Sequence, residues 1–120
     1  MEKLTAQEEE TMQVIWSVKQ GFIKDFLNEM PEPKPHYNSL ATMVKILEDK
    51  GFLGHEAVGN IYQYFPVISK EEYQKHAMKD IVSQYFDNSY SNMLAFFAKE
   101  QKLSEQELND IVNIIKTNKK

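Results

Sequence analysis

Apolar residues recur at intervals of three and four along most of the chain, and this spacing predicts a mainly helical protein. A first helix is predicted over residues 5–19, and its buried face consists of Met12, Ile15 and Trp16. We expect Gly21 to end this helix, because glycine takes the left-handed cap conformation at little cost. A second helix is predicted over residues 22–30, with an apolar stripe formed by Phe22, Phe26 and Met30.

The pattern changes from helical to β-prone between residues 36 and 67, after a connection that its prolines keep extended. One buried helical face is predicted for Leu40, Val44 and Leu47. Gly51 then supplies a helix stop, and two β-prone runs follow at residues 52–53 and 61–65, joined by a turn at residues 59–60. A helix followed directly by a hairpin is typical of a winged helix-turn-helix, in which the helix enters the DNA major groove.

A hydroxyl residue followed three positions later by glutamate marks the beginning of further helices, because the two side chains cap each other's backbone amides. Such capping boxes pair Thr5 with Glu8, Ser69 with Glu72 and Ser104 with Glu107. They predict helices over residues 70–86 and 104–117, with a break at residues 87–89 and a further helical stretch between. The predicted organisation is a winged-helix DNA-binding domain over residues 1–68 and a helical dimerisation region over residues 69–120.

The predicted tail helices have more apolar side chains than two or three helices can bury among themselves. We expect a second copy of the chain to cover them, because a symmetric dimer presents the same surface twice. The alternative is a monomer whose tail packs back on the winged helix. The residues predicted to form the dimer interface are Met78, Ile81, Val82, Tyr85, Phe86, Met93, Phe96, Phe97, Ile111 and Ile115.

Composition excludes several classes of protein. The 120 residues include no cysteine, which rules out disulfides, zinc-finger sites and thiol catalysis. The first ten residues are acidic and polar, unlike a signal peptide, and no apolar run approaches the roughly 20 residues of a membrane span. We therefore expect a cytoplasmic protein without membrane insertion.

The sequence has no phosphate loop, nucleophile motif or acid–base pair that would indicate an enzyme, and no cofactor is expected.

The charge is unusual for a protein that binds DNA. The net charge is −4, and all 14 basic residues are lysines. The predicted DNA-binding half is the acidic half, whereas in nucleic-acid-binding proteins it is usually the basic one. We expect only modest affinity for phosphates, falling quickly with salt.

Four groups of residues, in order along the chain, match one family pattern. The groups are Leu4, Thr5, Glu8 and Trp16; Tyr37, Asn38, Ser39, Leu40 and Thr42; Lys50, Gly51 and Leu53; and Gly59, Tyr62, Tyr64 and Pro66. Their order and spacing resemble the penicillinase-repressor family of bacterial winged-helix repressors, over nearly the whole chain. Two positions depart from the family, which has arginine where this chain has Ile46 and Asn60. Both departures remove a cation that serves backbone contact or ion pairing.

The resemblance and the helical pattern together predict the DNA-contacting residues. These are Tyr37, Asn38, Ser39, Thr42, Lys45, Lys50, His55 and Asn60. Hydroxyls such as those of Ser39 and Thr42 suit base edges, and the threonine methyl suits thymine. We expect Asn38 to cap its helix rather than read adenine. Lys45 is placed for the backbone, and Lys50 and His55 partly compensate for the missing arginines.

The resemblance also implies a mode of action. It implies that a homodimer holds a palindromic operator in double-stranded DNA and is released when a membrane sensor-protease system triggers a cut in the dimerisation region. In relatives the cut lies near an Asn-Phe pair, whereas the equivalent stretch here reads Leu94-Ala95-Phe96-Phe97. The alternative is a winged helix used for protein binding, with little DNA affinity, which the acidic balance favours.

One helix face has residue types that bind metals. Glu72, His76 and Asp80 are four residues apart on the predicted helix over residues 70–86. A single helix supplies too few ligands for a closed zinc site, so charge pairing with neighbouring lysines is the expected role and no metal is predicted.

Overall fold

The computed structural model describes residues 1–100 and 103–118. The elements follow the order α1 (Ala6–Val18), α2 (Ile23–Glu29), α3 (Tyr37–Asp49), β1 (Leu53–Val58), β2 (Ile61–Pro66), α4 (Lys70–Tyr85), α5 (Tyr90–Lys99) and α6 (Glu105–Asn118). The chain divides into two compact units, Met1–Lys75 and His76–Lys120. The predicted mainly helical fold with one small hairpin is confirmed, and the first strand is longer than predicted.

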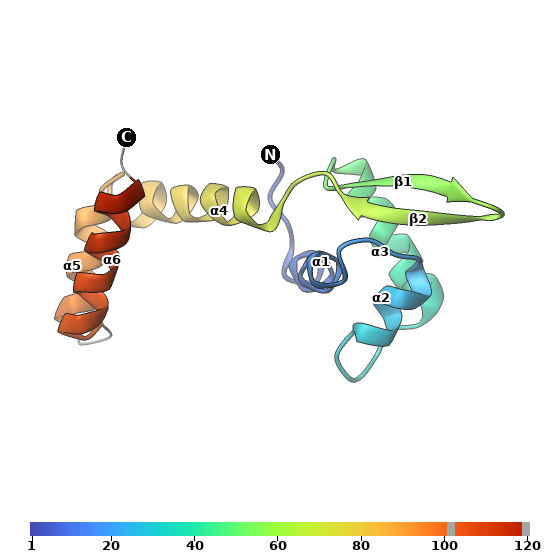
Figure 1. Cartoon of the computed structure of the whole chain (residues 1–120), viewed down its shortest axis with the longest axis horizontal. Helices are drawn as coiled ribbons and strands as arrows, with labels where there is room; N and C mark the ends of the chain where they lie inside the picture. The colour runs from blue at the N-terminus through green and yellow to red at the C-terminus, as the bar shows by residue number, and fades with distance from the viewer. Residues whose placement is uncertain (101–102, 119–120) are drawn as a thin grey trace. The chain divides into compact units, whose positions relative to one another are not determined.

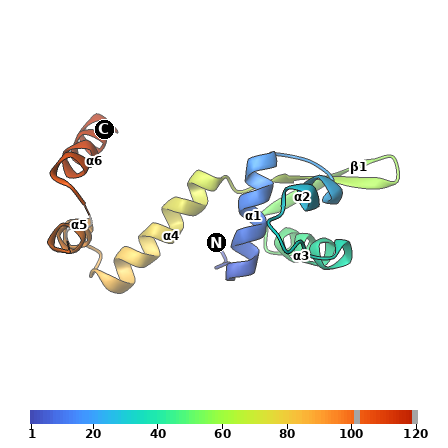
Figure 2. The ribbon, with the colours of Figure 1, turned by 90° about the horizontal axis from the view of Figure 1, so that it is seen from below.

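The first unit is a winged helix built around one apolar core. α1 and α2 pack against each other and against α3, and the antiparallel hairpin projects beyond them (Figures 1 and 2). The fully buried side chains of this unit are Met12, Ile15, Phe26, Leu40, Val44, Leu47 and Phe52. The helical spacing therefore identified the inner face of α3 and, on α1, the buried Met12 and Ile15. Trp16, which was predicted to be buried beside them, is only half-buried.

The connection from α1 to α2 differs from the prediction that Gly21 ends the first helix. α1 ends at Val18, and Lys19 is its C-cap with a φ of 83°. Gly21 pairs instead with β2, since its N–H donates to the Tyr64 carbonyl at 3.0 Å and its carbonyl accepts from the Tyr64 N–H at 2.8 Å. Gly21 thus anchors the base of the hairpin, and its lack of a side chain allows the Asp25 carboxylate to approach.

All the predicted capping boxes are present. The hydroxyl and carboxylate of each pair exchange hydrogen bonds with the opposite backbone amides, at Thr5 and Glu8, Ser69 and Glu72, and Ser104 and Glu107. Gly51 has the positive φ expected of a helix stop, at 85°. Local sequence therefore set where these helices begin and where α3 ends.

The second unit consists of most of α4 with α5 and α6. α4 ends near the predicted break, where Asp87 and Asn88 have φ values of 52° and 62° and Ser89 caps α5. Val82 is 2% exposed, and Phe86 packs on Phe96 with ring centroids 5.7 Å apart. The side chain of Ile115 lies outside the described residues.

Candidate nucleic-acid interface

The two faces of α3 have opposite characters. Leu40, Val44 and Leu47 point into the core, which fixes the rotation of the helix about its axis. The outer face includes five predicted DNA-contacting residues, all of them exposed: Tyr37, Asn38, Ser39, Thr42 and Lys45. The exposed Ile46 and Asp49 lie on the same face. The structure therefore gathers these residues on one uncovered helical surface of the first unit.

Asn38 does not cap this helix, so that prediction is wrong. His36 is the N-cap residue, with an extended backbone and no capping hydrogen bond from its side chain. Asn38 lies two positions inside the helix, and its backbone is already helical, whereas a side-chain cap needs the non-helical position. The Asn38 side chain is consequently exposed on the outer face and can donate and accept hydrogen bonds there.

Thr42 presents an acceptor and a methyl group. Its hydroxyl donates to the Asn38 carbonyl at 3.0 Å, which is the usual back-bond of threonine in a helix. The oxygen still has lone pairs, and the side chain, with its methyl group, is exposed. This arrangement suits a base-edge amino group or a thymine methyl.

The lysines of the first unit differ in their availability. The Lys50 ammonium lies 2.7 Å from the Glu8 carboxylate, and the Lys34 ammonium donates to the Leu27, Asn28 and Met30 carbonyls at the end of α2. Lys45 is exposed and makes no ion pair with any residue that the structure describes. Of the two lysines predicted to contact DNA, Lys45 therefore has a charge that is available to a phosphate. The charge of Lys50 is paired with Glu8 and stabilises the fold.

The hairpin presents aromatic and apolar side chains in place of arginine. The His55 ring contacts the Glu48 carboxylate and stacks on Tyr62 with ring centroids 4.3 Å apart. Asn60 is exposed at the turn, beside Gly59, whose φ is 63°. The hairpin thus keeps the wing geometry although its tip has no cation.

A cleft of about 330 Å³ separates the hairpin from the start of α3. It is lined by Phe22, Ile23, Lys24, Tyr37, Ile61, Tyr62 and Tyr64. Lys24 is exposed and was absent from the predicted contact residues. No local signal identifies it, because it reaches this surface only through the packing of α2 beside the hairpin.

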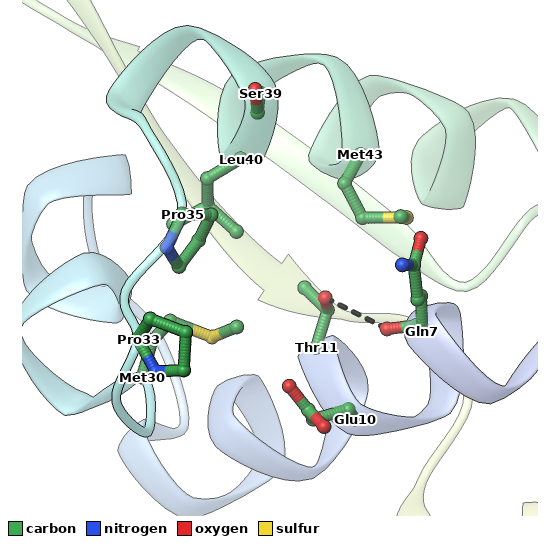
Figure 3. Close-up of a pocket in the computed structure, with 9 residues that line it drawn as sticks. All are labelled: Gln7, Glu10, Thr11, Met30, Pro33, Pro35, Ser39, Leu40 and Met43. Atoms are coloured by element: carbon green, nitrogen blue, oxygen red, sulfur yellow. Dashed lines mark hydrogen bonds between the residues drawn. The ribbon is translucent and has the colours of Figure 1, made fainter.

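A second cavity, of about 290 Å³, lies between α1, α3 and the proline-rich connection (Figure 3). Its walls are mostly methionine, proline and leucine side chains, and Glu10 is the ionisable residue among those that line it. The Thr11 hydroxyl is engaged with the Gln7 carbonyl at 3.0 Å. Because Glu10 is the one carboxylate among the lining residues, the cavity has no pair of catalytic carboxylates.

The possible metal-binding face of α4 is occupied by other interactions. The Glu72 carboxylate accepts from the Ser69 amide at 3.1 Å, and His76 lies 3.6 Å from Asp80. Within residues 1–100 and 103–118, no cluster of three or more metal-ligating side chains is present.

No helix in the part of the chain that the structure describes has the length and apolarity needed to cross a membrane.

Comparison with known proteins identifies the family. Residues 4–117 match the family described as Penicillinase repressor. The methicillin resistance regulatory protein MecI of Mammaliicoccus sciuri is 21% identical over 114 residues, which cover 94% of this chain and 93% of that protein. The penicillinase repressor of Bacillus licheniformis is 23% identical over 111 residues, covering 92% of this chain and 87% of that protein.

The family match extends over both units, and the fold and the predicted motifs agree with it. The relatives are transcriptional repressors and not enzymes. This chain therefore belongs to the penicillinase repressor family of DNA-binding, winged-helix transcriptional repressors.

Proposed function

We propose that this protein is a homodimeric repressor that binds a palindromic operator through the outer face of α3. The observation that supports this most is the exposed row of Ser39, Thr42 and Lys45 opposite the buried row of α3. A helix held in this way can enter the major groove with its polar face toward the bases. The hairpin, with Asn60 at its turn, lies against the flanking backbone.

Dimerisation is supported by the second unit, taken by itself. None of the described side chains of α5 is buried, although Phe96 and Phe97 are 50% and 37% exposed. Ile81, Tyr85 and Ile114 are also exposed, by 41%, 70% and 59%. A second copy covering these side chains would remove the apolar area from water and hold two α3 helices for two half-sites.

Release by proteolysis is the regulatory part of the proposal. One relative is named for methicillin resistance and another for penicillinase. We propose a sensor-protease system in the membrane upstream of this protein, and a cytoplasmic site of action. The stretch Leu94-Ala95-Phe96-Phe97 lies within α5, so a cut there would divide a helix of the dimerisation region. Loss of the dimer would remove an avidity of about 10²- to 10⁴-fold.

The test is a fluorescence anisotropy titration of the full chain with a palindrome from its own promoter, at two salt concentrations. Thr42→Ala or Ser39→Ala should cost about 1 kcal/mol and relax base preference at one position in each half-site. Lys45→Ala should weaken binding to all sequences and reduce the salt slope by about 1. The control is Lys3→Ala, because Lys3 is an exposed lysine outside α3 and the hairpin. This substitution should change neither the affinity nor the salt slope.

A second candidate is a winged helix that binds a protein partner. It is favoured by the net charge of −4, by the lack of arginine, and by the exposed hairpin residues Val58, Ile61 and Tyr62. If the folded dimer binds none of its promoter palindromes at low salt, the DNA-binding proposal is wrong and the protein-binding role takes its place.

A further inference from the structure

Two neighbouring glutamates of α1 reach in different directions. Glu8 pairs with Lys50 at the end of α3, whereas Glu9 accepts a hydrogen bond from the Tyr73 hydroxyl on α4. Tyr73 belongs to the first unit, Met1–Lys75, and is 7% exposed. α1 is therefore bonded both to the end of α3, the helix proposed to contact DNA, and to α4, which continues into the proposed dimerisation region.

Tyr73 is held by packing as well as by its hydroxyl. Its ring centroid lies 5.6 Å from that of Trp16 and 5.7 Å from that of Phe52. The Trp16 Nε1–H also donates to the Ile68 carbonyl at 2.9 Å, just before α4 begins. Burial, followed by the bond to Glu9, raises the pKa of Tyr73, so the hydroxyl stays protonated and remains a donor.

α4 continues as one helix from Lys70 to Tyr85. At about 1.5 Å per residue, its far end lies about 18 Å beyond Tyr73. A tilt of about 10° at Tyr73 would therefore displace that end by about 3 Å, if the helix stays straight. A small local change in the contacts at Tyr73 would consequently be amplified along α4.

We propose that Tyr73 and Glu9 are positioning residues that hold α4 in one direction relative to the winged helix, and so set the half-site spacing that the dimer accepts. This inference rests on the proposed function, because spacing has meaning only for a dimer that binds two half-sites. Neither residue needs to touch DNA. Their effect would appear in the choice between operators with the same half-sites and different spacers.

The experiment measures the affinity of the full chain for a palindrome selected from random DNA, for the same palindrome with two inserted base pairs, and for one half-site. The insertion rotates one half-site by about 70° and moves it by about 7 Å. Wild type should bind the inserted operator less tightly than the selected one. Tyr73→Phe keeps the ring and removes the hydroxyl, so it should reduce this preference by about three- to tenfold. Half-site affinity should stay unchanged.

Two further variants separate positioning from general damage. Glu9→Ala should reproduce the effect of Tyr73→Phe, and the double variant should show no further loss of spacing preference. Glu9→Gln keeps an acceptor for the hydroxyl and should retain most of the preference. Tyr90→Phe and Glu10→Ala are matched controls, because both residues are exposed and neither side chain has a hydrogen bond within the described residues.

The outcomes are distinguishable. If wild type binds no palindrome, the proposed function fails. If wild type prefers one spacing and both Tyr73→Phe and Glu9→Ala keep that preference, the positioning role is wrong and the proposed function stands. Equal losses for the selected operator, the inserted operator and the half-site would also overturn the positioning role, since they indicate damage to the winged helix itself.

Discussion

Neutralising Glu8 tests how far the ion pair inside the winged unit stabilises the fold. Glu8 is 6% exposed, and its Oε1 accepts from the Lys50 ammonium at 2.7 Å and from the Thr5 amide at 2.8 Å. The hydrogen bond from Lys50, followed by that from Thr5, lowers the pKa of Glu8 from its ordinary value of 4.5. The Glu8→Gln variant keeps an acceptor for Thr5 but removes the charge that faces Lys50.

The loss of stability that we expect from Glu8→Gln lies between the values for breaking a buried ion pair and an exposed one. Removing one partner of a fully buried pair costs about 3–5 kcal/mol, and exposed pairs contribute about 0.2–1 kcal/mol. The Lys50 side chain is 23% exposed and keeps part of its hydration, whereas that of Glu8 is 7% exposed. We therefore expect Glu8→Gln to lower the free energy of unfolding by about 1–2 kcal/mol at pH 7.

Urea unfolding followed by circular dichroism, at one fixed protein concentration, measures this difference. Glu72→Gln is the matched control, because Glu72 occupies the same capping-box position on α4, is exposed and pairs with no lysine within the described residues. It should change the free energy of unfolding by less than about 0.5 kcal/mol.

The pH dependence gives a second, independent check. Because the folded-state pKa of Glu8 lies below its ordinary 4.5, its charge stabilises the fold fully above that value. The stabilisation is lost as the pH falls through the folded-state pKa. The gap between wild type and Glu8→Gln should thus be constant near neutral pH and close in acid. Equal stabilities at pH 7, or a gap that persists in acid, would refute the assigned role of the pair.

Three other variants test separate parts of the structure. Lys19→Gly should raise the free energy of unfolding by about 1 kcal/mol, because Lys19 has a φ of 83°; a lower melting temperature would contradict this. Asn60→Arg should tighten operator binding without changing the preferred sequence, because a backbone cation positions but does not specify; an altered preference in a binding-site selection would count against it. Phe97→Glu should give monomers in sedimentation, because it places unpaired charge in the proposed interface. Wild-type protein that is already monomeric at high micromolar concentration would exclude the dimer.

Much of the secondary structure was readable because its signals are local. The capping boxes that begin at Thr5, Ser69 and Ser104 are complete within four residues, and Gly51 ends α3 through its own backbone freedom. The apolar spacing identified which face of α3 is buried. It therefore also identified Ser39, Thr42 and Lys45 as outward-facing, whereas their contact with DNA stays a prediction.

The local rules failed where a distant partner decided the outcome. Gly21 suggested a helix end, but its backbone pairs with Tyr64 in the hairpin, so Lys19 takes the strained position instead. Asn38 suggested a cap, but the helix begins one residue after His36 and places Asn38 inside it.

The sequence by itself determined the order of the elements, the inner and outer faces of α3 and the family pattern. Each element, and each group of residues in the pattern, depends on side chains a few positions apart. Only the tertiary structure decided which charged side chains are paired within the fold and which remain available to a partner. The bonds from Glu8 to Lys50 and from Glu9 to Tyr73 join residues 42 and 64 positions apart. No periodicity relates such pairs, because their proximity arises when α1 packs between the end of α3 and the start of α4.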